Sequence, residues 1–126
     1  MVAPRTAETP VVVEVPHAGL GVDALAAATL ASPVRALGLD ADLYVDELYQ
    51  DAPDVGATLL VARLSRYVCD LNRGEEDVDP LAASGGTAHS APHGLIWRST
   101  TEGYRSLTQP LSRAELRRRI ESYYRP

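Results

Sequence analysis

A run of β-branched residues that ends in a sharp turn constrains this chain more than any other feature. Residues 11–15 read Val-Val-Val-Glu-Val between Pro10 and Pro16, which predicts a strand, and the three successive valines suggest burial on both of its faces. The turn Pro-His-Ala-Gly at 16–19 then breaks the strand. A second apolar run at 57–62, Ala-Thr-Leu-Leu-Val-Ala, predicts another buried strand.

Helical signals lie between and after these two strands. A short helix is expected over about residues 24–31, and a second over about 40–49. The last helix is the best defined, because Ser112 and Glu115 fit the Ser-x-x-Glu capping box. With a further short strand expected at 94–97, this alternation of strands and helices predicts an α/β fold.

Two regions are assigned from their composition. Residues 74–93 are rich in Gly, Ser, Ala, Pro and acids, which predicts a loop. It is longer than most structural connections, and such loops are usually functional or mobile. In the last helix, the arginines at 117–119 are expected to form a solvated face, whereas Tyr123 and Tyr124 are expected to pack.

Length, charge and cysteine content exclude several classes of protein. The chain has 126 residues, enough for one domain of ordinary size. Its net charge of −5 disfavours a nucleic-acid binder, and its single cysteine, Cys69, excludes an internal disulfide. No apolar run approaches the roughly 20 residues that a membrane helix needs, and no signal-peptide pattern opens the chain. We expect a cytoplasmic protein with neither a nucleic-acid nor a membrane partner.

His17 and a group of acids are candidates for a metal site. His17 directly follows the first strand, and ligands of open α/β sheets gather at the carboxyl ends of strands. Imidazole is the commonest metal-ligating side chain, although a histidine satisfied by its neighbours, or merely exposed, is the alternative. Four acids crowd one short segment and could supply oxygen ligands, or form a solvated helix face: Asp40, Asp42, Asp46 and Glu47.

The densest polar run, between Arg63 and Arg73, is a candidate anion site. Guanidinium groups bind carboxylates and phosphates through paired hydrogen bonds. Asp70 could orient a neighbouring arginine, and Asn72 could donate to an oxyanion. The alternative is a set of salt bridges at the protein surface, which are individually weak.

Three further residues are weaker candidates. His89 and His93 are four residues apart, but the surrounding glycines and prolines argue against the helix that would place them on one face. Cys69 lies in an apolar stretch and is expected to be a buried hydrophobe rather than a nucleophile.

The order of these motifs resembles the N-formylglutamate amidohydrolase family, over about residues 10–126. The resemblance rests on Pro-His-Ala-Gly at 16–19, Asp-Leu-Tyr-Val-Asp-Glu-Leu-Tyr at 42–49, Ser-Arg-Tyr-Val-Cys-Asp-Leu-Asn-Arg at 65–73, Gly-Leu-Ile-Trp at 94–97 and Tyr-Tyr-Arg-Pro at 123–126. The run at 65–73 is the most specific of these. Ala18 stands where the family more often has serine.

The resemblance implies a hydrolase that depends on zinc or another divalent metal. Such an enzyme releases formate from the dicarboxylate N-formyl-L-glutamate in histidine degradation. The implied fold is α/β and phosphorylase/hydrolase-like, with a mixed sheet flanked by helices as in zinc carboxypeptidases and aspartoacylase. Non-catalytic carboxylate binding, or hydrolysis of another N-acyl amino acid, are the alternative functions.

The resemblance also assigns residue roles. His17 and Asp46 would ligate the metal, with Asp46 the less secure of the two. The substrate carboxylates would be held by Arg66, Asn72 and Arg73, with Asp70 orienting the arginines from behind.

Family chains extend beyond the Tyr-Tyr-Arg-Pro stretch and carry further histidines there. We therefore expect residues 10–126 to form the N-terminal part of a family domain whose C-terminal part is missing. Residues 1–9 are expected to be disordered. The third metal ligand and the general base stay unassigned. Weak or absent activity is expected for these residues alone, and homo-oligomerisation stays open because an incomplete core exposes apolar surface.

Overall fold

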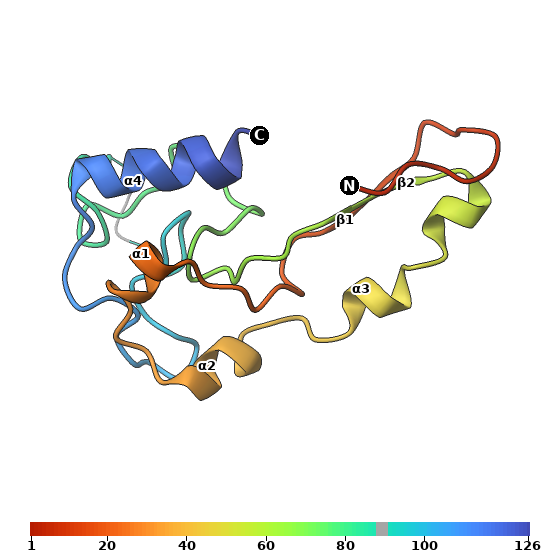
Figure 1. Ribbon diagram of the computed structural model, residues 1–126. Helices are drawn as coiled ribbons and strands as arrows, with labels where there is room; N and C mark the ends of the chain where they lie inside the picture. Colours follow the sequence, from red (N-terminus) through yellow and green to blue (C-terminus); the bar gives the residue numbers. More distant parts are fainter. Residues whose placement is uncertain (88–90) are drawn as a thin grey trace.

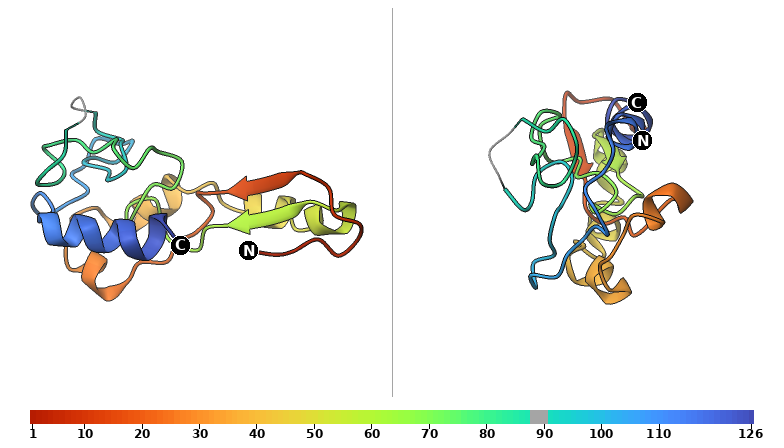
Figure 2. Two further views of the ribbon diagram at one scale, coloured as in Figure 1. Left: turned by 90° about the horizontal axis from the view of Figure 1, so that it is seen from above. Right: turned by 90° about the vertical axis from the view of Figure 1, so that its left-hand side faces the viewer.

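Two short parallel strands form the sheet of this protein. The computed structural model describes residues 1–87 and 91–126. In it, β1 (Val12–Val15) pairs with β2 (Thr58–Val61), with Val12 opposite Thr58 and Val15 opposite Val61. Figure 1 shows the strand pair projecting as an arm from a body that contains α1, α2 and α4. Figure 2 shows both strand arrowheads directed toward that body, so the residues that follow each strand enter it together.

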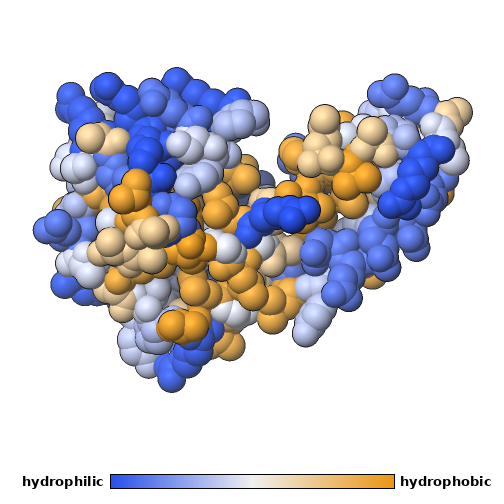
Figure 3. Space-filling view, viewed as in Figure 1, coloured by the Kyte–Doolittle hydropathy of each residue, from blue (hydrophilic) through white to orange (hydrophobic). Residues whose placement is uncertain are grey.

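Burial on both faces of the first strand, expected from its valines, is wrong. Val15 is 1% exposed, but Val12 is 59% exposed. Only the end of β1 reaches the body, whereas its beginning lies in the arm, where a two-stranded sheet offers little to pack against. Leu60 on β2 is exposed as well, and Figure 3 shows apolar residues at the surface of the arm.

The first residues, which the sequence predicts to be disordered, run along β2 in the structure. The Val2 N–H donates to the Leu59 carbonyl (2.7 Å), and the Leu59 N–H donates to the Val2 carbonyl (3.0 Å), which forms an isolated antiparallel bridge. Arg5 pairs with Asp54 at 2.8 Å. The described sheet is therefore a parallel pair with one antiparallel bridge, smaller than the mixed sheet flanked by helices that the resemblance implies.

The helices are shorter than expected, and one is new. α1 covers Ala24–Ala27, α3 covers Val45–Leu48, and α2 (Val34–Leu39) was not anticipated. α3 begins late because Tyr44, directly before it, has a left-handed backbone (φ 65°) that no helix accommodates. A short 3₁₀ helix (Ala52–Val55) leads into β2.

No strand forms at 94–97, where one was expected. His93 and Trp97 instead form an isolated antiparallel bridge. The apolar side chains of this segment, Leu95 and Ile96, are fully buried in the body, so core packing explains the apolar run. A short apolar run does not distinguish a strand from other buried structure.

The main core lies in the body and includes part of the region expected to be a loop. Its buried members are Cys69, Val78, Ala82, Ala83, Leu95, Ile96, Leu107, Leu111 and Leu116. Residues 74–87 contain no helix or strand, but three of these core residues come from them, so this stretch is packed. The burial of Cys69 confirms the expectation for that residue.

The last helix begins where the capping box places it. α4 covers Arg113–Arg119, and the Glu115 N–H donates to the Ser112 hydroxyl oxygen (3.1 Å). A π-helical turn, Ile120–Tyr124, continues it, and Tyr123 and Tyr124 pack against the core as expected. Among the described residues, no helix has the length and apolar character to cross a membrane.

One expectation for α4 is wrong, because Arg119 is fully buried rather than solvated. Its guanidinium donates to the carbonyls of Tyr67 (3.3 Å) and Val68 (3.0 Å) and to the hydroxyl of Thr29 (2.7 Å), and it pairs with Glu115 at 2.9 Å. A buried cation is tolerated when its donors are satisfied in this way. Arg119 thereby anchors the segment that follows β2.

Candidate functional site

The candidate site forms where the chain leaves the two parallel strands. Beyond β1 and β2 the segments stay in contact, because Gly21 donates to the Arg63 carbonyl (2.9 Å) and Ser65 donates to the Gly21 carbonyl (2.8 Å). Val15 is paired with Val61, and Gly21 is paired with Leu64. Between these two pairs, the first segment contains residues 16–20, whereas the second contains only residues 62 and 63. The longer segment therefore forms a bulge, which contains the buried His17.

Gly19 allows the two segments to approach each other. A Cβ atom at this position would lie 2.3 Å from the Arg63 carbonyl carbon and 2.7 Å from the Ala62 carbonyl oxygen. These are backbone atoms, so they could not move aside for a side chain. The glycine of the Pro-His-Ala-Gly turn is thus required by packing against the segment after β2.

Five side chains, His17 among them, form a closed ring of interactions. The His17 Nε2 atom lies 2.7 Å from Asp70 Oδ1, and its Nδ1 atom lies 3.4 Å from Asp42 Oδ2. The other oxygen of Asp42 accepts from Arg66 (2.9 Å). The guanidinium of Arg66 lies over the Trp97 ring, 5.2 Å from its centroid, and the Trp97 Nε1–H donates to Asp70 Oδ2 (2.8 Å). The ring therefore joins segments that lie far apart in the sequence.

Asp70 is the buried acceptor of this ring. Its side chain is 2% exposed and also accepts from the backbone N–H of Asn72 (3.0 Å). Asp70 accepts from Trp97 and Asn72, and a carboxylate at this position would also accept from the Nε2 of His17. The Nδ1 of His17 is left as the nitrogen that faces Asp42.

A second buried carboxylate fixes the segment that carries Asp42. Asp40 accepts from the hydroxyl groups of Tyr67 and Thr101 and from the backbone N–H of Thr101 (3.1 Å). Burial alone would raise the pKa of Asp40, but the hydrogen bonds from Thr101 and Tyr67 outweigh it and hold this pKa below its usual value. Burial and the bond to Asp40 raise the pKa of Tyr67 far above its ordinary value. Both groups therefore keep the protonation states that this bond needs.

The structure brings together most of the residues expected in the site. His17, Arg66 and Asp70 belong to the ring. Arg73 and Asn72 follow directly, with the Arg73 Nε atom 4.0 Å from Asp70 Oδ2, and both residues are exposed.

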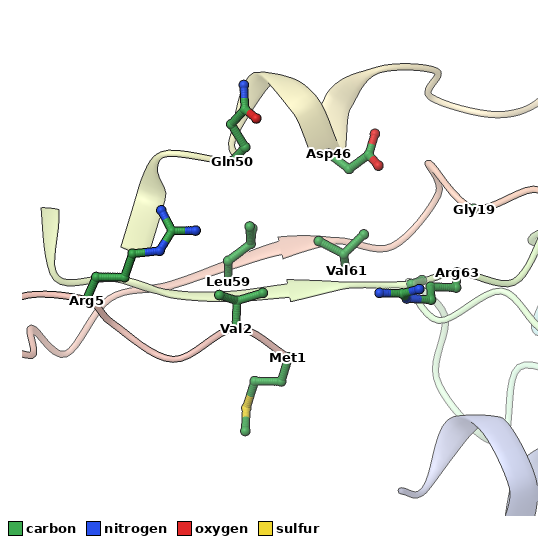
Figure 4. A pocket seen from close by; sticks show the side chains of 10 residues that line it. Met1, Val2, Arg5, Gly19, Asp46, Gln50, Leu59, Val61 and Arg63 are labelled. Carbon is green, nitrogen blue, oxygen red and sulfur yellow. The ribbon is translucent and has the colours of Figure 1, made fainter. Parts of the chain in front are cut away.

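Asp46 lies elsewhere. It is exposed on α3 and lines a pocket of about 640 Å³ between that helix and β2, with Gln50, Leu59, Val61 and Arg63 (Figure 4). In the described part of the chain it forms no ion pair with His17. Asp42, four residues earlier, takes the place next to the imidazole.

The ring contains two residues to which the family resemblance assigned no role. Asp42 stood among the crowded acids, and Trp97 stood in the Gly-Leu-Ile-Trp motif. These two patterns marked Asp42 and Trp97 as residues of interest. The side chains that they contact could not be predicted, because those contacts join segments that are distant in the sequence. His93 stacks on Trp97, with the ring centroids 4.2 Å apart, and His89 lies outside the described residues.

Comparisons with known proteins agree on one family. The family model described as N-formylglutamate amidohydrolase matches residues 9–126. An N-formylglutamate deformylase of Pseudomonas putida is 34% identical over 119 residues, which cover 93% of this chain and 42% of the relative. One from Pseudomonas aeruginosa is 37% identical over 73 residues, which cover 58% of this chain and 27% of the relative.

A solved structure agrees with these sequence matches. The crystal structure of an N-formylglutamate amidohydrolase from Ralstonia eutropha JMP134 matches with a TM-score of 0.83 and 34% identity, over 98% of this chain and 45% of that one. The chain thus spans less than half the length of these relatives. Sequence and fold lead to the same conclusion: the chain belongs to the N-formylglutamate amidohydrolase family.

Proposed function

We propose that this chain carries part of the active site of an enzyme that hydrolyses the formyl amide of N-formyl-L-glutamate to formate and L-glutamate. The observation that carries the proposal is the ring around His17. In it, a histidine suited to metal binding and an arginine suited to carboxylate binding meet on one carboxylate, Asp42. The family to which the chain belongs and the names of its relatives support the same reaction.

Arg66 and Arg73 supply positive charge for a dicarboxylate substrate. The chain has a net charge of −5, yet these two arginines and Asn72 lie within the short run that follows β2. Among the described residues, Arg66 has one hydrogen bond, to a carboxylate whose side chain is 51% exposed. A substrate carboxylate would replace Asp42 as its acceptor, because guanidinium groups bind carboxylates in general. Arg73 and Asn72 are exposed beside it and would hold the second carboxylate.

The donor atoms around His17 fit a divalent cation. Metal-ligating histidines commonly donate their other ring N–H to a carboxylate, as His17 does to Asp70. The remaining nitrogen and an oxygen of Asp42 face each other at 3.4 Å, and a divalent cation could accept a lone pair from each of them. We infer that His17 and Asp42 hold zinc or another divalent ion, in place of the pair His17 and Asp46.

Two ligands do not complete a catalytic zinc site, which has about three from the protein. Within residues 1–87 and 91–126, no group of three or more His, Cys, Asp or Glu residues is arranged to hold a metal ion. When bound, a divalent ion supplies activation of water and polarisation of the amide carbonyl. The residues of this chain would orient the substrate and position the ion through Asp70.

Zinc binding by two matched variants tests the choice of carboxylate. Asp42→Asn and Asp46→Asn make the same chemical change four residues apart, at exposed positions. We expect the first to weaken Zn²⁺ binding by about tenfold or more and the second to leave it unchanged. The reverse result would restore Asp46 as the ligand.

Formate release and a panel of substrates test the reaction. We expect N-formyl-L-glutamate to be preferred over the N-acetyl and N-succinyl compounds. We expect weak turnover by the 126 residues alone, because the described residues supply only part of a ligand set. Preference for another acyl group would favour a different amidohydrolase. Dicarboxylate binding without any metal binding would favour a non-catalytic carboxylate-binding module.

Three wider inferences rest on the family resemblance. We infer a complete fold of the zinc carboxypeptidase type, a role in histidine degradation, and a cytoplasmic location.

A further inference from the structure

Trp97 touches both halves of the candidate site. Its Nε1–H donates to Asp70, which holds His17, and its ring face carries the guanidinium of Arg66. We propose that Trp97 is a positioning residue, which sets the metal-facing imidazole and the carboxylate-binding arginine relative to each other. This inference deepens the proposed function and rests on it.

The bond from Trp97 sets the orientation of the Asp70 carboxylate. The Oδ1 atom of Asp70 accepts from His17 and from the Asn72 backbone. Its Oδ2 atom accepts from Trp97 at 2.8 Å, whereas the Arg73 Nε atom is 4.0 Å away. Trp97 is thus the near donor that prevents this oxygen from turning. Without it the carboxylate gains rotational freedom, and the His17 imidazole loses its fixed partner.

The ring of Trp97 sets the plane of Arg66. The Nε atom of Arg66 is buried and has no hydrogen-bond partner among the described residues, and the guanidinium has one hydrogen bond, to Asp42. If Asp42 turns toward a cation or yields to a substrate carboxylate, that bond is lost. The Trp97 face then holds the guanidinium in place, since a cation over an aromatic ring is attracted by its π electrons.

Trp97 is itself held rigidly. It is 4% exposed, His93 stacks on it, and the Tyr67 ring meets it edge-on with the centroids 5.6 Å apart. Its indole therefore has a fixed orientation from which both contacts are made.

Two substitutions separate the two contacts. Trp97→Phe keeps an aromatic face for Arg66 but removes the N–H, and Trp97→Leu removes both. For Trp97→Phe we expect Zn²⁺ binding to weaken by about tenfold, as for other residues that orient a metal ligand, with binding of N-formyl-L-glutamate unchanged. For Trp97→Leu we expect both to weaken. If Trp97 had a purely structural role, each variant would weaken Zn²⁺ binding and N-formyl-L-glutamate binding to the same extent. That result overturns the proposal, and so does unchanged Zn²⁺ binding in Trp97→Phe.

An NMR measurement tests the same inference without any ligand. Trp97 is the only tryptophan, so the protein gives a single indole N–H signal. We expect this signal to shift in Asp70→Asn, and the His17 ring nitrogens to report Nε2–H in the wild type and a mixture of tautomers in Trp97→Phe. An unchanged His17 tautomer in Trp97→Phe contradicts the positioning role. If the wild type binds neither Zn²⁺ nor N-formyl-L-glutamate, that result would instead contradict the proposed function.

Discussion

Asp70→Asn is the substitution whose effect follows most directly from the structure. The change is nearly isosteric, so packing is preserved and only the hydrogen bonding differs. Asp70 accepts from three donors: His17 Nε2, Trp97 Nε1 and the Asn72 backbone N–H. Asparagine has one oxygen and one NH₂ group, so at least one of these donors then faces another donor inside the protein.

The expected cost is about 3 kcal/mol of unfolding free energy. A hydrogen bond to a charged group contributes about 1.5–3 kcal/mol, and a buried donor left without an acceptor costs about 1–3 kcal/mol. At a denaturant slope of about 1.5 kcal/mol per molar urea, the unfolding midpoint falls by about 2 M. Far-UV circular dichroism and the fluorescence of Trp97 give two independent readings of the transition.

The same substitution on the surface provides the control. Asp54 pairs with Arg5 at 2.8 Å, but both side chains are about half exposed, and such surface pairs contribute little to stability. Asp54→Asn should therefore leave the midpoint almost unchanged. If Asp70→Asn unfolds within 0.5 M of Asp54→Asn, or about 0.75 kcal/mol at the same slope, the buried network does not stabilise the fold as argued.

Three further predictions concern other buried or half-buried groups. Arg119→Met should destabilise the protein by about 3 kcal/mol in urea titrations, because the carbonyls of Tyr67 and Val68 lose their donors. The control Arg117→Met, at an exposed position of the same helix, should cost little. Equal effects of the two substitutions would contradict the anchoring role of Arg119. Burial raises the pKa of Cys69 to about 12, so this thiol should resist a thiol reagent at pH 8 until urea unfolds the chain. Fast labelling of the native protein would contradict the burial of Cys69. The hydrogen bond from Arg118 lowers the pKa of Glu115 in the folded protein, so Glu115 stabilises the fold above its unfolded pKa, and this stabilisation is lost as the pH falls through the folded pKa. Glu115→Gln should therefore flatten the loss of unfolding free energy below about pH 5. An unchanged pH profile would show that the pair of Glu115 and Arg118 does not cause that loss.

Local patterns predicted the elements whose causes are local. The β-branched runs predicted β1 and β2, and the capping box placed the start of α4 at Ser112. The sequence also placed His17 at the carboxyl end of a strand, and the structure shows that the run after β2 leaves the parallel neighbour at the same end of the sheet. The Pro-His-Ala-Gly turn marked where that edge lies.

The features that sequence patterns missed depend on long-range contacts or on one backbone angle. Asp42 and Asp46 are four residues apart, and the left-handed conformation of Tyr44 between them decides which of them lies next to His17. Trp97 meets Asp70 only after the chain between them has folded. The burial of Arg119 had a local signal, because it is three residues from Leu116 and so shares its helix face, but its charge favoured the solvated interpretation.

Binding of N-formyl-L-glutamate to this chain tests the central claim most directly. Isothermal titration calorimetry on the wild type, Arg66→Gln and the exposed control Arg117→Gln compares an arginine of the ring with one on α4. We predict measurable binding by the wild type and by Arg117→Gln, and a loss of about tenfold or more in Arg66→Gln, as expected for a charge-assisted hydrogen bond. Equal affinity in all three proteins, or no binding by the wild type, would contradict the assignment of this ring as the substrate site.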